Sequence, residues 1–139
     1  MGFTKKSAER FFNLLIQNNV RVLIDVRLNN KSQLAGFAKA EDLRYFFQTI
    51  AGIKYKHFPS LAPTKELLNA YKQGKIGWEQ YVPEYLQLLR QNDILDNLDI
   101  SEFEDGCLLC SEDLPEQCHR RLLAEYLQSQ FPEIDIIHL

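Results

Sequence analysis

The chain has 139 residues and a mass of 16.3 kDa, which is the size of one ordinary domain. Hydrophobic residues at 45% and charged residues at 25% match an average globular protein and exclude a disordered tail, a collagen-like repeat and a coiled coil. The formal charge of −3 argues against a general polyanion binder.

Helices and strands alternate along the predicted chain. In chain order, the predicted elements are a helix over 7–18, a strand over 20–26, a helix over 40–51, a strand over 53–58, helices over 65–73 and 78–90, a strand over 107–110, a helix over 118–127 and a strand over 134–138. Apolar residues recur every three or four positions in the helices, and the strands are short and apolar or alternating. The pattern predicts an α/β fold: a single domain over 1–139 with a parallel sheet flanked by helices in three layers, Rossmann-like.

The carboxyl ends of the predicted strands carry most of the polar residues that are candidates for chemistry. In parallel α/β sheets, ligands bind at this edge. The candidates there are Asp25 and Arg27, Tyr55 and His57, then Cys110, Ser111 and Glu112, with Cys118, His119 and Arg120 opening the helix that follows. We expect all of these side chains to converge on a single cleft.

The segment 110–120 is the most specific feature. A strand-to-helix loop with free amides, a helix dipole and an arginine attracts anions and lowers the pKa of a thiol. Cys110 or Cys118 is therefore a candidate nucleophile, and Glu112 and His119 are candidate general acids or bases. Buried cysteines that merely pack the core are the alternative.

A zinc site would use Cys107, Cys110, Cys118 and His119, which are the ligand types of structural zinc. Cys107 and Cys110 lie three apart on a predicted strand, so their side chains leave opposite faces, whereas paired zinc cysteines occupy a turn. The sequence therefore predicts no metal and no other cofactor.

Several other polar and aromatic residues have two interpretations. Asp25 and Arg27 either pair with each other or leave Arg27 free to bind phosphate or carboxylate together with Lys31 and Ser32. Tyr55 and His57 share a strand face. They are either substrate contacts or a partly buried pair whose polar groups form hydrogen bonds within the protein. The aromatic residues at helical spacing favour core packing over a stacking platform for bases; they are Trp78, Tyr81 and Tyr85.

Charge and cysteine content bear on the partner and the compartment. Residues 1–56 carry ten Lys or Arg against four Asp or Glu, a net charge of +6, while 57–139 carry six against fifteen, a net charge of −9. A polarised surface would steer an anionic small molecule or nucleic acid to the basic side; ordinary solvation is the alternative. With no long apolar run, no apolar leader and three cysteines, an odd number, we expect a cytoplasmic protein that does not enter membranes.

Four groups of residues together resemble one known family. They are Leu23-Ile24-Asp25-Val26-Arg27, Ser32 to Phe37, Ile53 to His57, and Leu108 to Glu112 followed by Pro115 and Cys118-His119-Arg120. Over nearly the whole chain they are similar to the family catalogued as domain of unknown function number 488. The resemblance implies this fold and this candidate site, but no agreed reaction.

The chain departs from the family pattern in two places. Members typically begin with a short strand that ends in Thr-Ile-Gly, and Gly2 resembles that glycine, so we expect the chain to lack this N-terminal strand and to leave a sheet edge open. The proline and arginine common near the Ser32 loop are Asn30 and Gln33 here, which weakens an anion site in that loop.

Two functional hypotheses follow. In the first, the protein is an enzyme for an anionic or nucleotide-like substrate: Arg27 and Arg120 orient the substrate, Glu112 is the acid or base, and Cys110 or Cys118 is the nucleophile. In the second, it is a noncatalytic module that binds nucleic acid or a partner protein through its basic N-terminal half. The sequence leaves the oligomeric state open.

Overall fold

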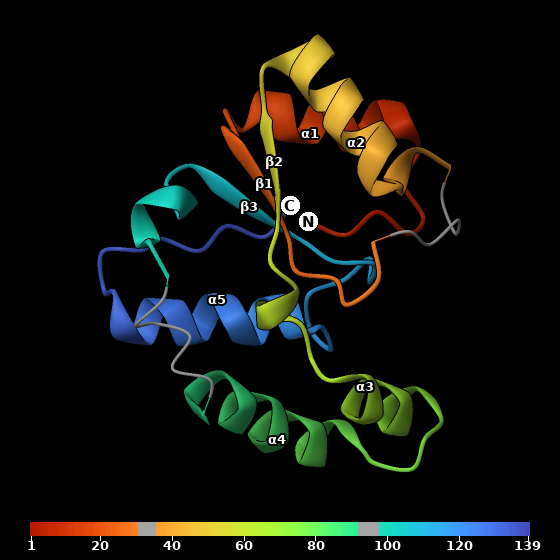
Figure 1. The fold of residues 1–139 in the computed structure, drawn as a ribbon, viewed down its shortest axis with the longest axis vertical. Helices are drawn as coiled ribbons and strands as arrows, with labels where there is room; N and C mark the ends of the chain where they lie inside the picture. Colours follow the sequence, from red (N-terminus) through yellow and green to blue (C-terminus); the bar gives the residue numbers. More distant parts are fainter. Residues whose placement is uncertain (31–35, 92–97) are drawn as a thin grey trace.

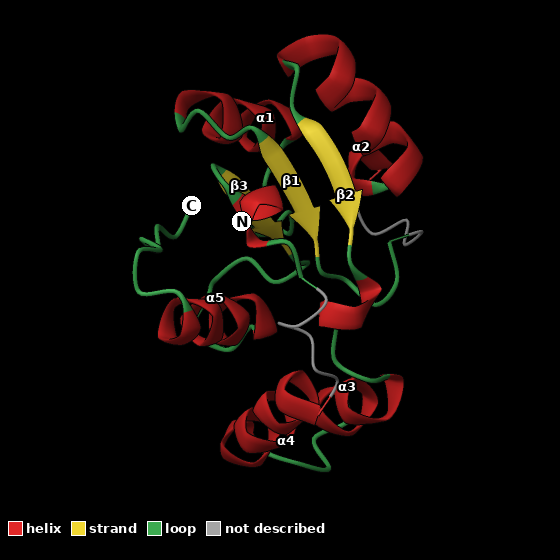
Figure 2. Cartoon of the chain, turned by 60° about the vertical axis from the view of Figure 1, so that its left-hand side comes forward, coloured by secondary structure: helices red, strands yellow, loops and turns green. Residues whose placement is uncertain are grey.

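A computed structural model of the chain describes residues 1–30, 36–91 and 98–139. Three parallel strands form the sheet in the order β2-β1-β3; they are β1 Val22–Asp25, β2 Lys54–His57 and β3 Gly106–Leu109. Figure 2 shows β1 between the other two strands. The strands run in the same direction, so their carboxyl ends lie at one edge, as predicted for a parallel sheet.

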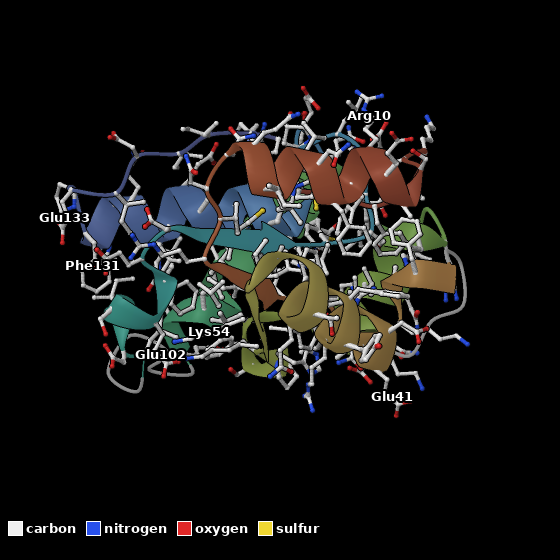
Figure 3. All side chains as sticks on the ribbon, turned by 90° about the horizontal axis from the view of Figure 1, so that it is seen from above. Arg10, Glu41, Lys54, Glu102, Phe131 and Glu133 are labelled. Carbon is white, nitrogen blue, oxygen red and sulfur yellow. The ribbon has the colours of Figure 1, made fainter. Side chains whose placement is uncertain are left out.

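Helices cover both faces of the sheet, which confirms the three-layer α/β prediction. On one face lie α1 Ala8–Gln17 and α2 Ala40–Phe46, which continues as a π-helical turn over Phe47–Ala51 (Figure 1). The other face carries α5 His119–Gln130, which contacts β3, and α4 Trp78–Gln91 packs against α5 and against α3 Lys65–Lys72. Arg10 on α1 and Glu41 on α2 extend from the exposed surfaces of these helices (Figure 3).

Side-chain alternation along β1 divides the interior into two cores. Leu23 belongs to the core beneath α1 and α2, where Phe11 and Phe47 pack with ring centroids 6.0 Å apart. Val22 and Ile24 belong to the core with α3, α4 and α5. Every residue of β1 is buried, as expected for the central strand of a covered parallel sheet.

The aromatic residues of α4 lie in the second core. Tyr81 and Tyr85 are 2% and 0% exposed, and Trp78 stacks on Tyr81 with ring centroids 5.2 Å apart. Core packing is therefore confirmed for these residues.

Predicted capping residues define several helix ends. The side-chain oxygens of Ser7 and Thr64 accept hydrogen bonds from the amides of Arg10 and Leu67, both at 3.2 Å. Gly52 ends the π-helical turn with φ at 63°, a left-handed conformation that glycine adopts without steric cost.

The start of the chain lies alongside β3. Residues 1–7 form no strand, as expected, but Gly2 forms an isolated parallel bridge with Cys110. The amine of Met1 donates to the carbonyl of Leu108 at 2.9 Å, and the amide of Cys110 donates to the carbonyl of Met1 at 3.1 Å. These bonds occupy the edge of β3 that the sequence predicted to be open.

The strand predicted over 134–138 is wrong. The structure has no strand there, because residues 1–4 already occupy the edge next to β3. This segment instead follows the surface, with Ile134 against the second core and Leu139 against the first. Among the helices that the structure describes, none is both long enough and apolar enough to span a bilayer.

Candidate functional site

Two groups of polar side chains lie at the carboxyl edge of the sheet. Cys110, Cys118 and His119 form a thiol–imidazole cluster on the α4–α5 side. Asp25, Arg27 and Tyr55 form a carboxylate cluster toward the α1–α2 side. These residues lie at the carboxyl edge of the sheet, where the structure groups them in two clusters.

The thiol–imidazole cluster joins the end of a strand to the start of a helix. Cys110 directly follows β3, Cys118 is the N-cap residue of α5, and His119 is the first residue of that helix. The side chains of the three residues are buried, and their ligand atoms lie within 4.8 Å of one another. The chain reversal over 111–117 thus brings together residues that the sequence separates by up to nine positions.

Arg120 holds that reversal in place. Its guanidinium donates to the carbonyl oxygen of Glu112, to the carbonyl oxygen of Asp113 at 3.0 Å and to Cys118 Sγ at 3.3 Å. Arg120 is only 3% exposed, so these protein acceptors replace water around a buried cation. These hydrogen bonds hold the 111–117 loop in place beside Cys110 and Cys118.

The hydrogen bonds of His119 define which nitrogen faces the thiol. Nε2 lies 3.0 Å from the carbonyl oxygen of Val26, and Nδ1 lies 3.6 Å from Cys110 Sγ. A carbonyl can only accept, so Nε2 carries the hydrogen. Nδ1 is therefore the ring nitrogen that faces Cys110.

The environment favours a thiolate at Cys110. A hydrogen bond from Cys118 lowers the pKa of Cys110 most strongly; burial opposes this, and the positive charge of His119 lowers the pKa further, to well below the usual value for cysteine. The same bond to Cys110, together with burial, raises the pKa of Cys118. Cys110 is thus the sulfur that ionises and Cys118 the thiol that donates to it.

His119 changes in the complementary direction. Burial lowers its pKa, but the charge of Cys110 and the hydrogen bond to it outweigh burial, so the net pKa is raised. The two residues therefore favour a thiolate–imidazolium pair, an arrangement found in nucleophilic cysteine sites.

Two tyrosines of α4 cover the thiol–imidazole cluster. Tyr85 meets the ring of His119 edge-on, with centroids 5.7 Å apart, and its hydroxyl donates to the carbonyl of Leu61 at 2.6 Å. Burial, with smaller contributions from nearby Cys110 and Cys118, raises the pKa of Tyr81. Cys110 is 2% exposed and Cys118 is 1% exposed, so both cysteines are buried in this environment.

The same cluster contains the described residues best placed to hold a metal ion. Cys107 does not join them, because it packs in the opposite core, as the strand alternation predicted. The guanidinium of Arg120 already donates to Cys118 Sγ, which places a cation where a metal would add a second one. Two thiols and an imidazole beside an arginine are better suited to thiol chemistry than to a metal centre.

In the carboxylate cluster, Arg27 is fully engaged with the protein. Its Nε and Nη2 donate to the two carboxylate oxygens of Asp25 at 2.7 and 2.6 Å, and its Nη1 donates to the carbonyl of Ala38 at 2.9 Å. Tyr55 donates to Asp25 at 2.5 Å; burial, then this bond, raises the pKa of Tyr55 to about 12. The pairing of Asp25 with Arg27 is confirmed.

The remaining candidates lie apart from the thiols. His57 Nε2 donates to the carbonyl of Arg27 at 2.9 Å rather than pairing with Tyr55. The side chain of Glu112 is exposed, and its backbone carbonyl is the group that meets Arg120. Lys31 and Ser32 lie outside the described residues. Sequence reasoning missed the Val26 carbonyl, which no side-chain pattern reveals, and missed Tyr81 and Tyr85 as a cover because their spacing indicated only core.

The basic and acidic halves of the chain meet in ion pairs. Basic residues of 1–56 pair with acidic residues of 57–139 in Lys6–Asp113 at 2.5 Å, Lys56–Glu102 at 3.0 Å and Arg21–Asp105 at 3.1 Å. Lys54 and Glu102 lie on the same side of the molecule in Figure 3. The folded protein thus brings charges together that the sequence keeps apart.

No curated protein and no solved structure matches the chain. The family model described as domain of unknown function DUF488 matches residues 7–127, which include all three strands and both clusters. The protein belongs to the family of domain of unknown function DUF488.

Proposed function

We propose that the protein is an enzyme that uses Cys110 as a nucleophile and His119 as its proton partner on a small anionic substrate. The observation that carries this proposal is the orientation of His119, whose bond to Val26 directs Nδ1 at Cys110 Sγ. A base oriented by a third group is the arrangement that activates a nucleophile in covalent catalysis.

The proposed reaction has two steps. Cys110 attacks an electrophilic carbon, a sulfur–carbon bond forms, and the leaving group departs with the proton from His119 Nδ1. His119, now neutral, accepts a proton from water as the water oxygen attacks the same carbon. The sulfur–carbon bond then breaks and restores the thiolate and the imidazolium.

The charges at the start of α5 support an anionic substrate. The first turn of this helix contains no acidic residue and begins with His119, Arg120 and Arg121, of which Arg121 pairs with Glu125 in the next turn at 3.5 Å. Cations at a helix N-terminus oppose the helix dipole by roughly 0.3–1 kcal/mol each, so a nearby anion relieves a local excess of positive charge. The Cys110 thiolate is one such anion, and an anionic substrate would be another.

Burial limits the size of the substrate. With both sulfurs at 2% exposure or less, access requires a shift of the α4 tyrosines or of the 111–117 loop. The alternative function, nucleic-acid binding through the basic half, has weaker support because Lys6, Arg21 and Lys56 pair with acidic side chains.

Alkylation of the three cysteines tests the nucleophile. Cys107 is the matched control, since it lies on β3, three residues before Cys110, and is also buried, at 7% exposure. We expect iodoacetamide to modify Cys110 before Cys107 at neutral pH, as read by peptide mass spectrometry. In Cys110→Ser we expect this early modification to be absent. Equal modification of both cysteines, or modification of Cys107 first, would refute the proposed nucleophile.

Comparison of two alkylating agents tests the preference for anions. Iodoacetate and iodoacetamide deliver the same carbon to sulfur, with and without a negative charge. We expect the ratio of iodoacetate to iodoacetamide rate constants to be higher at Cys110 than at Cys107 of the same protein. A lower ratio at Cys110 would remove the anionic part of the proposal and leave the nucleophile.

A further inference from the structure

We further propose that Cys110 and Cys118 form a reversible disulfide when a hydroperoxide oxidises Cys110, and that this disulfide switches the proposed nucleophile off. The inference rests on the proposed function, because it requires the same reactive sulfur at Cys110. It adds a second role for that site: a dithiol that responds to peroxide.

The geometry selects this pair of cysteines. Their sulfurs lie within 4.8 Å of each other. Cys110 directly follows β3, and Cys118 is the N-cap residue of α5. A disulfide needs a sulfur–sulfur separation of about 2.05 Å, so the two side chains must rotate toward each other and the 111–117 loop between them must move to close the gap. Cys107 is excluded as a partner, because it points into the opposite core.

The first step oxidises Cys110. The thiolate attacks one oxygen of hydrogen peroxide, a sulfur–oxygen bond forms, and the oxygen–oxygen bond breaks. The departing hydroxide takes the proton from His119 Nδ1 and leaves as water. Sulfur has lost two electrons to the peroxide, and Cys110 is a sulfenic acid.

The second step forms the disulfide. His119 Nδ1 is now unprotonated, and a ring nitrogen of His119 lies within 4.8 Å of Cys118 Sγ; as Cys118 moves toward Cys110, Nδ1 accepts the proton of that thiol. Cys118 attacks the sulfur of Cys110, the sulfur–oxygen bond breaks, and hydroxide leaves as water with the proton from His119. Overall, two thiols and one peroxide give one disulfide and two waters.

Burial favours a small oxidant over a large one. Cys110 at 2% exposure and Cys118 at 1% exposure are buried, so a bulky disulfide oxidant cannot reach them unless the surrounding side chains move. Hydrogen peroxide is close to water in size. The Arg120 guanidinium, 3.3 Å from Cys118 Sγ, stabilises the thiolate that Cys118 becomes as it attacks.

The test treats the reduced protein with equimolar hydrogen peroxide, blocks free thiols with N-ethylmaleimide and maps peptides by mass spectrometry. We expect a Cys110–Cys118 disulfide, loss of iodoacetamide reactivity at Cys110, and recovery of that reactivity with dithiothreitol. Cys118→Ser is expected to stop at a Cys110 sulfenic acid, trapped by dimedone, and Cys107→Ser is expected to behave as the parent protein does.

The outcomes separate the two proposals. If Cys110 is alkylated selectively but peroxide yields sulfenic or sulfinic acid and no disulfide in the parent protein, the disulfide inference fails and the nucleophile stands. If Cys110 reacts with neither reagent, both fail. A disulfide that includes Cys107, or stoichiometric zinc released from the purified protein, would also overturn the inference. The parent-protein measurement decides the question even if Cys118→Ser does not fold.

Discussion

His119 donates its Nε2 hydrogen to the carbonyl oxygen of Val26 at 3.0 Å, and Val26 directly follows the central strand β1. The amide of Val26 in turn donates to the carbonyl of Leu109 at 3.1 Å, on the strand that leads into Cys110. The backbone of Val26 therefore connects the imidazole to the strand that carries its thiol partner. This backbone connection orients the ring so that its other nitrogen, Nδ1, faces Cys110.

Replacement of His119 by glutamine tests the proton partner. The side-chain amide of glutamine can still donate a hydrogen bond, but it carries no positive charge, so the pKa of Cys110 should rise. We expect the pH profile of iodoacetamide alkylation at Cys110 to move to higher pH, with the reactive thiolate fraction falling about tenfold for each unit by which the pKa comes to exceed the assay pH. Alkylation that is quenched at set times at each pH, followed by peptide mapping, measures this pH profile.

The matched control is His57→Gln. His57 also donates from Nε2 to a backbone carbonyl, that of Arg27 at 2.9 Å, but no cysteine has been found beside it in the described structure. We expect an unchanged Cys110 profile in this variant. If His57→Gln moves the profile as far as His119→Gln does, the shift reflects loosened strand ends rather than a lost imidazolium.

Much of the fold could be predicted because each local signal agrees with the tertiary structure. Ser7 and Thr64 cap helices where expected, and Gly52 ends the helix that precedes β2. The apolar segment 134–138 was misassigned because a strand also needs a free edge, and residues 1–4 hold the edge of β3. Competition between distant segments for one edge leaves no trace in local periodicity.

The candidate site was predictable in composition but not in arrangement. The loop after β3 and the start of α5 identified Cys110, Cys118 and His119 as neighbours. The use of Arg120 as a holder of backbone carbonyls could not be foreseen, since a sequence does not show which carbonyls a loop leaves unpaired. The guanidinium of Arg27 likewise donates its hydrogen bonds to Asp25 and to the backbone carbonyl of Ala38.

The stability of the protein should depend on pH through the thiol–imidazole cluster. The pKa of His119 is raised on folding, so its stabilisation is complete below the unfolded value of roughly 6.5 and is lost as pH rises through the folded value. The pKa of Cys110 is lowered, so its stabilisation is complete above its unfolded value of roughly 8.5 and is lost as pH falls through the folded value.

The two contributions to the pH dependence have opposite signs, since folding favours the protonated form of His119 and the deprotonated form of Cys110. The raised pKa of Cys118 adds stability that is lost at alkaline pH. We expect the free energy of unfolding in urea to fall above pH ~9, with a shallower alkaline fall in Cys118→Ala. An equally steep fall in that variant would contradict the assignment of the buried proton to Cys118.

Asp25→Asn should destabilise the protein strongly. Asp25 is 0% exposed and receives two bonds from Arg27, so the substitution leaves a buried guanidinium without its counter-charge. Breaking a buried pair in this way costs about 3–5 kcal/mol. Urea unfolding measures the change.

Glu102→Gln is the control for an exposed pair. Glu102 and Lys56 are 38% and 36% exposed, so this pair contributes about 0–1 kcal/mol. Similar losses in Asp25→Asn and Glu102→Gln would show that the Asp25–Arg27 pair does not depend on burial for its effect.

Gly2→Ala should disturb the loop that Arg120 holds. A methyl group at Gly2 would overlap the carbonyl oxygen of Glu112, an acceptor for Arg120, and would lie 3.1 Å from Arg120 Nη1. Because the overlap is with backbone, the loop or residues 1–4 must move, and overpacking of this kind costs roughly 1–3 kcal/mol. Gly77→Ala is the matched control, since no heavy atom lies within 4 Å of a methyl group there. We expect thermal unfolding at a lower temperature for Gly2→Ala alone; equal melting temperatures for the two variants would mean that residues 1–4 do not pack against this loop in solution.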